Sequence, residues 1–132
     1  MSALAVTLYD ETTDGKTVNK VELRLVSHNT TLRDVISQRI KHEVDKHNSK
    51  QQEVFQGLVQ PTDAEVMLNG YRLRKKREIS FEKQFEKAIQ AFNANGFFAL
   101  LDDKQVDDLD SPLILTEDSH LSFIKLVPLV GG

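Results

Sequence analysis

The last stretch of the chain, HLSFIKLVPLVGG at residues 120–132, decides the fold prediction. Its first eight residues are mostly apolar and predict a β-strand that runs to Val127. Pro128 ends this strand because proline has no N–H to donate to a neighbouring strand. A short apolar link then leads to Gly131 and Gly132, so a strand is followed closely by two residues without side chains.

The terminal glycine pair has two interpretations. Chain ends are usually frayed, and the pair would then have no role. Alternatively, the carboxylate of Gly132, which is ionised at neutral pH, can attack the α-phosphate of ATP and form an acyl-adenylate. Two residues without Cβ atoms fit the narrow channel that such a reaction needs, because they adopt almost any φ. The pair alone leaves both interpretations open.

Composition excludes several classes of protein. The 132 residues are enough for one domain with a core, and 39% of them are hydrophobic and 28% charged. The absence of cysteine excludes disulfides, a thiolate metal site and a cysteine nucleophile. A net charge of −3 disfavours nucleic acid as a partner. Because no membrane span or signal peptide is recognisable, we expect a cytoplasmic protein that does not bind membranes.

The N-terminal part predicts a β-hairpin. Residues 4–9 and 20–26 alternate between apolar and polar, as expected for half-buried strands, and Asp14-Gly15 between them is a strong turn pair. A helix is predicted next, with Thr31 as its cap and one apolar stripe formed by Leu32, Val35, Ile36, Ile40 and Val44.

Histidines in this helix are not expected to bind a metal. His42 and His47 are five residues apart, which does not place two ligands on one helix face, so both are predicted to face solvent and no metal site is expected.

The middle of the chain is the least readable part. Residues 48–63 are predicted to form a connection, anchored by the apolar residues Val54, Phe55, Leu58 and Val59. Residues 65–73 are predicted to form a short strand with an Asn69-Gly70 turn. A basic run follows, comprising Arg72, Arg74, Lys75, Lys76 and Arg77. It would suit an acidic partner or nucleic acid, but the overall acidity favours a solvated loop.

A second helix is predicted from its cap at Ser80 to a C-terminal cap at Gly96. Its apolar stripe is predicted to be core, and it comprises Phe81, Phe85, Ala88, Ile89 and Phe92. Residues 97–101 predict a buried strand, residues 102–105 a turn, and residues 106–115 an irregular apolar segment.

This order of elements resembles the ubiquitin-like β-grasp fold, in which a hairpin precedes a helix and the C-terminal strand lies centrally beside the first. The end Val127-Pro128-Leu129-Val130-Gly131-Gly132 is similar to that of the sulfur-carrier branch, which includes the small subunit of molybdopterin synthase and the thiamine sulfur carrier. The resemblance covers residues 4–47 and 97–132. It implies an α+β fold with a mixed sheet covered by a helix.

The domain prediction follows from the resemblance. We expect a single β-grasp domain over residues 1–132, with residues 48–95 as an insertion that contains one helix and residues 128–132 as a flexible tail. Metabolic sulfur carriers are compact, so a chain with this insertion looks more like a modifier from a bacterial ubiquitin-like conjugation system.

The resemblance implies a non-enzymatic acyl carrier. Gly132 would be the acyl donor, and an activating enzyme would read the tail formed by Pro128, Leu129, Val130 and Gly131. That enzyme would use ATP, while this chain would bind no cofactor. Further partners would be a conjugating enzyme, a deconjugating peptidase, and either a target lysine or a sulfur donor. No pair of groups at a readable spacing predicts catalysis by the chain itself.

The final predicted strand is apolar on both faces. Ile124 and Leu126 lie on the opposite side from Leu121 and Phe123, so a partner or the inserted helix is expected to cover them. Two alternatives to a protein modifier therefore remain. One is a sulfur carrier for cofactor biosynthesis, and the other is a β-grasp module that is not conjugated and interacts with a partner or with itself.

Overall fold

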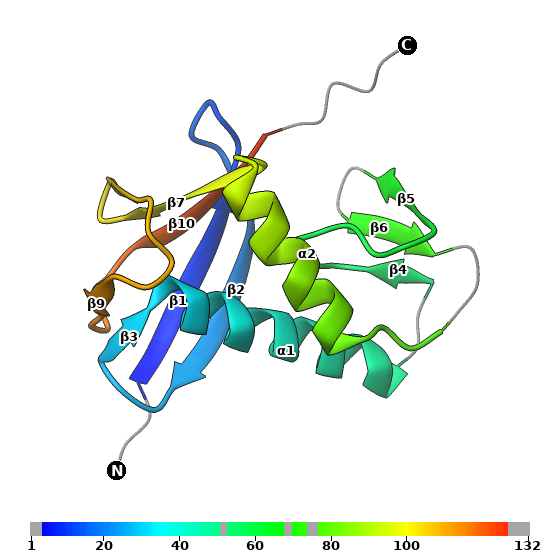
Figure 1. Ribbon diagram of the computed structural model, residues 1–132, viewed down its shortest axis with the longest axis horizontal. Helices are drawn as coiled ribbons and strands as arrows, with labels where there is room; N and C mark the ends of the chain where they lie inside the picture. Colours follow the sequence, from blue (N-terminus) through cyan, green and yellow to red (C-terminus); the bar gives the residue numbers. More distant parts are fainter. Residues whose placement is uncertain (1–3, 51–52, 68–69, 74–76, 127–132) are drawn as a thin grey trace. The chain divides into compact units, whose positions relative to one another are not determined.

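The computed structural model describes residues 4–50, 53–67, 70–73 and 77–126. The chain divides into two compact units, one formed by Met1–Leu32 with Phe92–Gly132 and the other by Arg33–Ala91. These are the first and the second unit, and Figure 1 labels the helices and strands of both. Neither helix in the described part of the chain has the length and apolar content needed to cross a membrane.

The first unit begins with the predicted hairpin. Strands β1 (Leu4–Glu11) and β2 (Thr17–Leu25) pair antiparallel, with Leu4 opposite Leu25. Gly15 occupies the turn with a φ of +87°, a conformation that glycine adopts without steric cost. The backbone N–H of Thr12 donates to Lys16 and that of Gly15 donates to Thr12, both at 2.9 Å, and these bonds close the turn.

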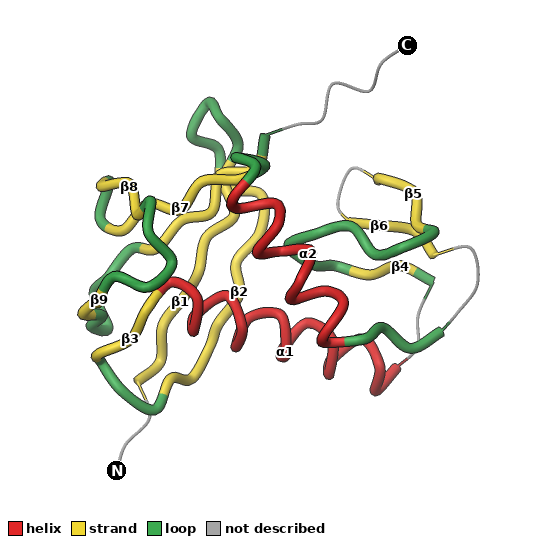
Figure 2. Tube along the Cα trace, in the orientation of Figure 1, coloured by secondary structure: helices red, strands yellow, loops and turns green. Residues whose placement is uncertain are grey.

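A five-stranded mixed sheet is built on this hairpin, in the order β2-β1-β10-β7-β8. Strand β10 (Leu121–Lys125) pairs parallel with β1 and antiparallel with β7 (Phe97–Leu101), so it lies in the middle of the sheet (Figures 1 and 2). Strand β8 (Lys104–Val106) pairs with β7 at the edge. The predicted adjacency of the first and last strands is confirmed, although β10 ends at Lys125 and Val127 lies outside the described residues.

One face of this sheet carries the core of the first unit. Leu8, Leu121 and Phe123 are fully buried there, and the rings of Phe97 and Phe123 lie 5.9 Å apart between centroids. The alternation of apolar and polar residues in β1 explains this, because successive side chains of a strand point to opposite faces. Leu4 and Val6 share the buried face with Leu8, as the sequence predicted.

Three predicted details of the first unit are wrong. The segment 106–115 is not irregular throughout, because β9 (Pro112–Ile114) pairs antiparallel with β3 (Asn29–Thr31). The residue that caps the helix before β7 is Asn95 and not Gly96, because Asn95 has a φ of +61°, the left-handed conformation that asparagine tolerates. The turn after β7 uses Asp102 and Asp103, both at positive φ, so β8 begins at Lys104.

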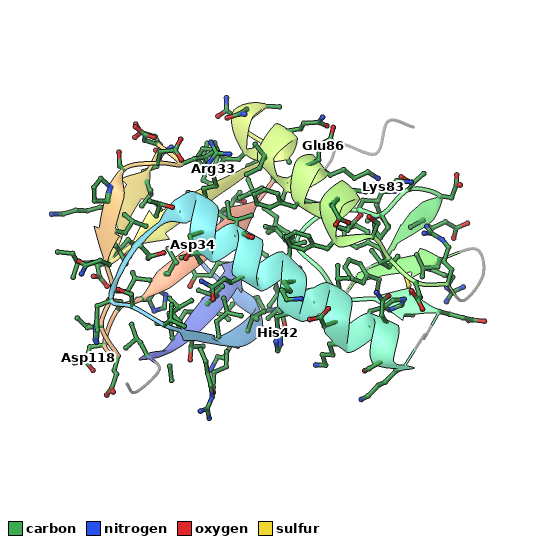
Figure 3. The ribbon with its side chains drawn as sticks, turned by 60° about the horizontal axis from the view of Figure 1, so that its bottom comes forward. Arg33, Asp34, His42, Lys83, Glu86 and Asp118 are labelled. Carbon is green, nitrogen blue, oxygen red and sulfur yellow. The ribbon has the colours of Figure 1, made fainter. Side chains whose placement is uncertain are left out.

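The second unit contains all but the first residue of helix α1 (Leu32–Lys50). The predicted stripe is confirmed as buried, from Leu32 through Ile36 and Ile40 to Val44. The helix is longer than predicted and reaches the beginning of the segment expected to be a connection. Arg33, Asp34 and His42 lie along it in Figure 3.

Three short strands follow α1 and form a separate sheet in the order β4-β6-β5. They are β4 (Val54–Phe55), β5 (Ala64–Met67) and β6 (Gly70–Leu73), and both pairings are antiparallel. The segment 65–73, predicted as a short strand with an Asn69-Gly70 turn, therefore forms two paired strands, and Asn69 lies outside the described residues. Gly70 stands at its turn with a φ of +150°, and a Cβ there would lie 2.9 Å from the carbonyl oxygen of Phe55.

Helix α2 (Phe81–Asn93) completes the second unit, and its last two residues belong to the first. The predicted cap is confirmed, because the backbone N–H of Lys83 donates to the Ser80 hydroxyl at 3.3 Å. The prediction that its aromatic stripe is core is only partly correct. Ala88 is fully buried, but Phe81, Phe85, Ile89 and Phe92 are half-buried. The polar Gln84 is buried instead, because its side-chain amide donates to the carbonyl of Val59 at 3.2 Å.

Candidate functional site

The face of the five-stranded sheet opposite the core of the first unit is the first candidate site. Ile124 on β10 lies directly between Glu11 on β1 and Phe98 on β7, and Ser122 lies between Tyr9 and Leu100. Directly paired residues project to the same face of a sheet. We call this set of residues, with Leu126 just after β10, the outer face.

Part of the outer face is apolar. Phe98, Leu100 and Ile124 are half-buried, and Leu126 is 41% exposed. Ser122, at their centre, is only 2% exposed, so larger side chains cover it. Partly exposed apolar side chains that gather on one face of a sheet are typical of interaction sites.

An aromatic and charged cluster borders these apolar residues. The rings of Tyr9 and His120 stack with centroids 4.1 Å apart and planes 11° apart. Nε2 of His120 lies 3.4 Å from a carboxylate oxygen of Glu11, and the ammonium of Lys20 lies 5.8 Å from the centre of the Tyr9 ring. The cluster therefore combines a stacked platform with groups of both charges.

The predicted tail residues Pro128, Leu129, Val130, Gly131 and Gly132 lie outside the described residues. The chain is placed as far as Leu126, whose backbone N–H donates to the carbonyl of Gly96 at 3.3 Å. This bond continues the ladder between β10 and β7 by one residue beyond the strand.

The structure brings the predicted residues Ile124 and Leu126 together with others that the sequence analysis missed. Phe98 and Leu100 belong to the outer face, but the run FFALL is apolar at every position and gives no sign of which residues point outward. Tyr9 and His120 are 111 positions apart along the chain, so only the parallel pairing of β1 with β10 brings them together. The alternation of apolar and polar residues in β1 was the one available signal, and it places Tyr9 on the face opposite Leu8.

The two histidines of α1 have different environments. His42 is exposed, as predicted, whereas the prediction that His47 faces solvent is wrong, because it is only 7% exposed. Its Nε2 lies 3.1 Å from the carbonyl oxygen of Arg77, and its ring meets the Phe55 ring edge-on at 5.4 Å. A backbone partner and an apolar neighbour account for its burial. Among the described residues, no group of three His, Cys, Asp or Glu could hold a metal ion.

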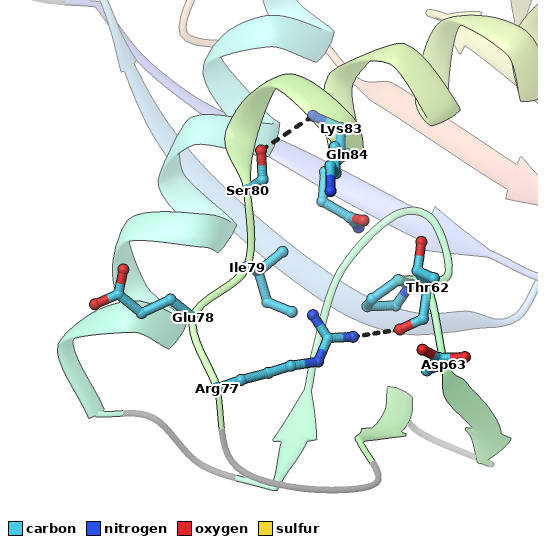
Figure 4. A pocket seen from close by; sticks show the side chains of 9 residues that line it. Thr62, Asp63, Arg77, Glu78, Ile79, Ser80, Lys83 and Gln84 are labelled. Atoms are coloured by element: carbon cyan, nitrogen blue, oxygen red, sulfur yellow. Dashed lines mark hydrogen bonds between the residues drawn. The ribbon is translucent and has the colours of Figure 1, made fainter.

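The second unit contains a cavity of about 590 Å³ beside the beginning of α2 (Figure 4). The cavity is formed by two loop segments and the first turn of the helix. It is lined by Pro61, Thr62, Asp63, Arg77, Glu78, Ile79, Ser80, Lys83 and Gln84. Arg77 belongs to the predicted basic run. Of that run, Arg74, Lys75 and Lys76 lie outside the described residues.

Comparison with known proteins identified no relative. The chain matches no protein family, no curated protein and no solved structure.

Proposed function

We propose that this chain is a ubiquitin-like carrier with a β-grasp core, whose Gly132 carboxylate is activated and transferred. The observation that supports this most is the position of β10, which lies centrally and parallel to β1 in the order β2-β1-β10-β7-β8. A hairpin, a helix, further strands and a central parallel last strand are the features of the β-grasp fold. The same fold carries many functions, so the proposal depends on the glycine pair.

The chemistry of the proposed activation is balanced. The Gly132 carboxylate attacks the α-phosphate of ATP, an acyl-phosphate bond forms, and pyrophosphate leaves. A lysine amine or a sulfur donor then attacks the acyl carbon and AMP leaves, giving an isopeptide or a thiocarboxylate. Gly131 has no Cβ that would obstruct the approach of an enzyme channel, and Pro128, Leu129 and Val130 are the residues that the enzyme would grip.

The geometry before the tail suits such an enzyme. β10 is hydrogen-bonded on both sides, and Leu126 is still bonded to Gly96, so the chain is held up to the tail. Ile124 and Leu126, which lie within four positions of the tail, present apolar surface on the outer face. An activating enzyme that binds this surface would have the tail within reach of its active site.

ATP–pyrophosphate exchange with the activating enzyme of the source cell tests the proposal. The chain that ends at Gly132, whether by synthesis or by cleavage, should support exchange. The same chain without Gly132, and a Gly131→Phe variant, should not, while their melting temperatures should equal that of the intact chain. Hydroxylamine capture of the activated end provides a second measurement.

The acceptor distinguishes the two carrier functions. Intact-mass spectrometry after activation would show oxygen replaced by sulfur in a sulfur carrier, and an isopeptide-linked lysine in a protein modifier.

A second candidate function is an interaction module that is not conjugated. The apolar residues of the outer face, Phe98, Leu100, Ile124 and Leu126, favour it, because they offer binding surface without the tail. If the chain without Gly132 is activated as well as the intact chain, the carrier proposal is wrong and this module remains. Sedimentation equilibrium of a Leu126→Ser variant against the unchanged chain would then show whether the partner is a second copy.

A further inference from the structure

Charge is distributed very unevenly between the two units. The first unit has five Lys and Arg against eleven Asp and Glu, a formal charge of −6, whereas the second has twelve against nine, a formal charge of +3. A local positive charge on a chain of net charge −3 attracts anions to one part of the molecule only. The cavity beside α2 lies wholly within the positive unit.

Two cations contact Thr62 beside this cavity, and a third, Lys83, lines it. Arg77 donates a hydrogen bond from its guanidinium to the Thr62 carbonyl, and Figure 4 shows it pointing between Ile79 and Thr62. The Lys87 ammonium donates to the Thr62 hydroxyl at 2.8 Å and to the carbonyl of Gln60 at 3.2 Å. Lys83 lines the cavity one turn before Lys87 on the same helix.

The surroundings of Lys87 disfavour its charged form, chiefly through desolvation. Desolvation, followed by the charge of Arg77 and then that of Lys83, lowers the pKa of Lys87, and Asp63 only partly opposes this. Like charges four residues apart on a helix are also unfavourable for the helix itself. Glu78, the other acid of the lining, points away from the remaining side chains in Figure 4.

Two of the cations already have a structural role, and the third does not. Arg77 and Lys87 hold the loop at residues 60–62 through its oxygens. Within the described residues, the ammonium of Lys83 has neither a hydrogen bond nor an ion pair. Pro61 and Ile79, which also line the cavity, are buried, so the lining combines apolar surface with the charged groups.

We propose that this cavity binds a small soluble molecule bearing a phosphate group, with Lys83 and Arg77 as its cationic contacts. Phosphate offers several acceptor oxygens and a double charge, which satisfy converging Lys and Arg donors. The volume of about 590 Å³ exceeds that of a phosphate alone and leaves room for a small organic group beside the apolar residues Pro61 and Ile79. The site lies in the second unit and does not depend on the proposed function of the tail.

Titration of the full-length ¹⁵N-labelled chain with inorganic phosphate tests this proposal. Ionic strength is kept constant with sodium chloride, and backbone amide shifts of residues 79–84 are followed. These shifts should saturate with phosphate, and Lys83→Ala should weaken binding by about fivefold or more, as expected for loss of a charge-assisted contact. Lys83→Arg keeps the charge and should bind phosphate like the unchanged chain.

Lys41→Ala is the matched control. Lys41 is also an exposed helical lysine, but it pairs with Asp45 at 3.2 Å and does not line the cavity. Its removal should leave the phosphate affinity unchanged. Shifts that do not saturate, or equal weakening by Lys41→Ala and Lys83→Ala, would overturn the proposal. The proposal would also be wrong if the chain sediments with phosphatidic acid vesicles but does not bind free phosphate. The site would then recognise a membrane surface and not a small soluble molecule.

Discussion

The side chain of Asn48, near the end of α1, forms two hydrogen bonds with the backbone of Ile79. Its amide nitrogen donates to the Ile79 carbonyl at 3.0 Å, and its carbonyl oxygen accepts from the Ile79 N–H at 2.8 Å. The Asn48 side chain thus satisfies both the backbone N–H and the backbone carbonyl of Ile79, as a paired β-strand would. Together with the contact between His47 and the Arg77 carbonyl, this pair fixes the segment that leads into α2.

Asn48→Ala should therefore destabilise the protein by about 1–3 kcal/mol, because it leaves part-buried backbone groups of Ile79 without partners. Chemical denaturation measures the change, and faster amide exchange at Ile79 would locate it. Ser49→Ala is the control, since Ser49 is exposed and its hydroxyl bonds only within α1, to Lys46. Equal stability of the two variants would contradict the prediction.

Ile36→Ala should be among the more costly single substitutions in α1. Ile36 is 0% exposed, and replacing a large buried aliphatic side chain by alanine typically costs about 2–5 kcal/mol. Urea denaturation followed by circular dichroism measures this. A loss below about 0.5 kcal/mol would show that the site collapses around the smaller residue or is not core.

Glu43→Ala should destabilise the protein by about 3–5 kcal/mol, the usual cost of breaking a buried ion pair on one side. Glu43 accepts from Nε of Arg39 at 3.0 Å and, with its other oxygen, from the backbone N–H of Leu58 at 3.2 Å. Both side chains of the pair are buried. Asp45→Ala, which breaks an exposed pair with Lys41, should cost less than about 1 kcal/mol in the same denaturation experiment.

The Lys87 amine should lose its proton at a lower pH than an ordinary lysine amine. Desolvation and the charge of Arg77 lower its pKa from the ordinary value of 10.5. Between the lowered pKa of folded Lys87 and 10.5, the unfolded chain therefore binds more protons than the folded chain. In this pH range, Lys87 makes the free energy of unfolding increase as the pH rises. Side-chain ¹³C NMR titration measures the amine directly, and Arg77→Gln should move the Lys87 transition upward. A Lys87 transition at or above the ordinary value of 10.5 would contradict the prediction.

Local patterns predicted most of the elements. Alternation in β1 and β2 with Asp14-Gly15 between them specified the hairpin, because turn chemistry and side-chain period are properties of neighbouring residues. The apolar stripe from Leu32 to Val44 specified α1 for the same reason. The predicted ends of the helices were less accurate. The last turns of α1, up to Lys50, consist of polar residues, which carry no hydrophobic period that would predict a helix.

Burial of polar side chains was not predictable from the sequence. Gln84 and His47 are polar positions that a pattern assigns to solvent, yet each is buried because a distant carbonyl, of Val59 or of Arg77, accepts its hydrogen bond. The partner lies 25 or 30 residues away, and no local signal encodes it. The same reason explains why β9, a three-residue strand that pairs with β3, was not recognised.

The sequence by itself determined the hairpin, the buried stripe of α1, the cap of α2 and the presence of a final apolar strand. Only the tertiary structure decided which residues share a surface. The parallel pairing of β1 with β10 brings Tyr9 to His120, and the pairing of β10 with β7 brings Phe98 to Ile124. Strand order and register result from contacts between segments that are distant in the chain, such as Phe98 and Ile124 at 26 positions and Tyr9 and His120 at 111. Helix and strand periods result from contacts between near neighbours. For this reason the elements could be predicted from the sequence, and the outer face and the cavity could not.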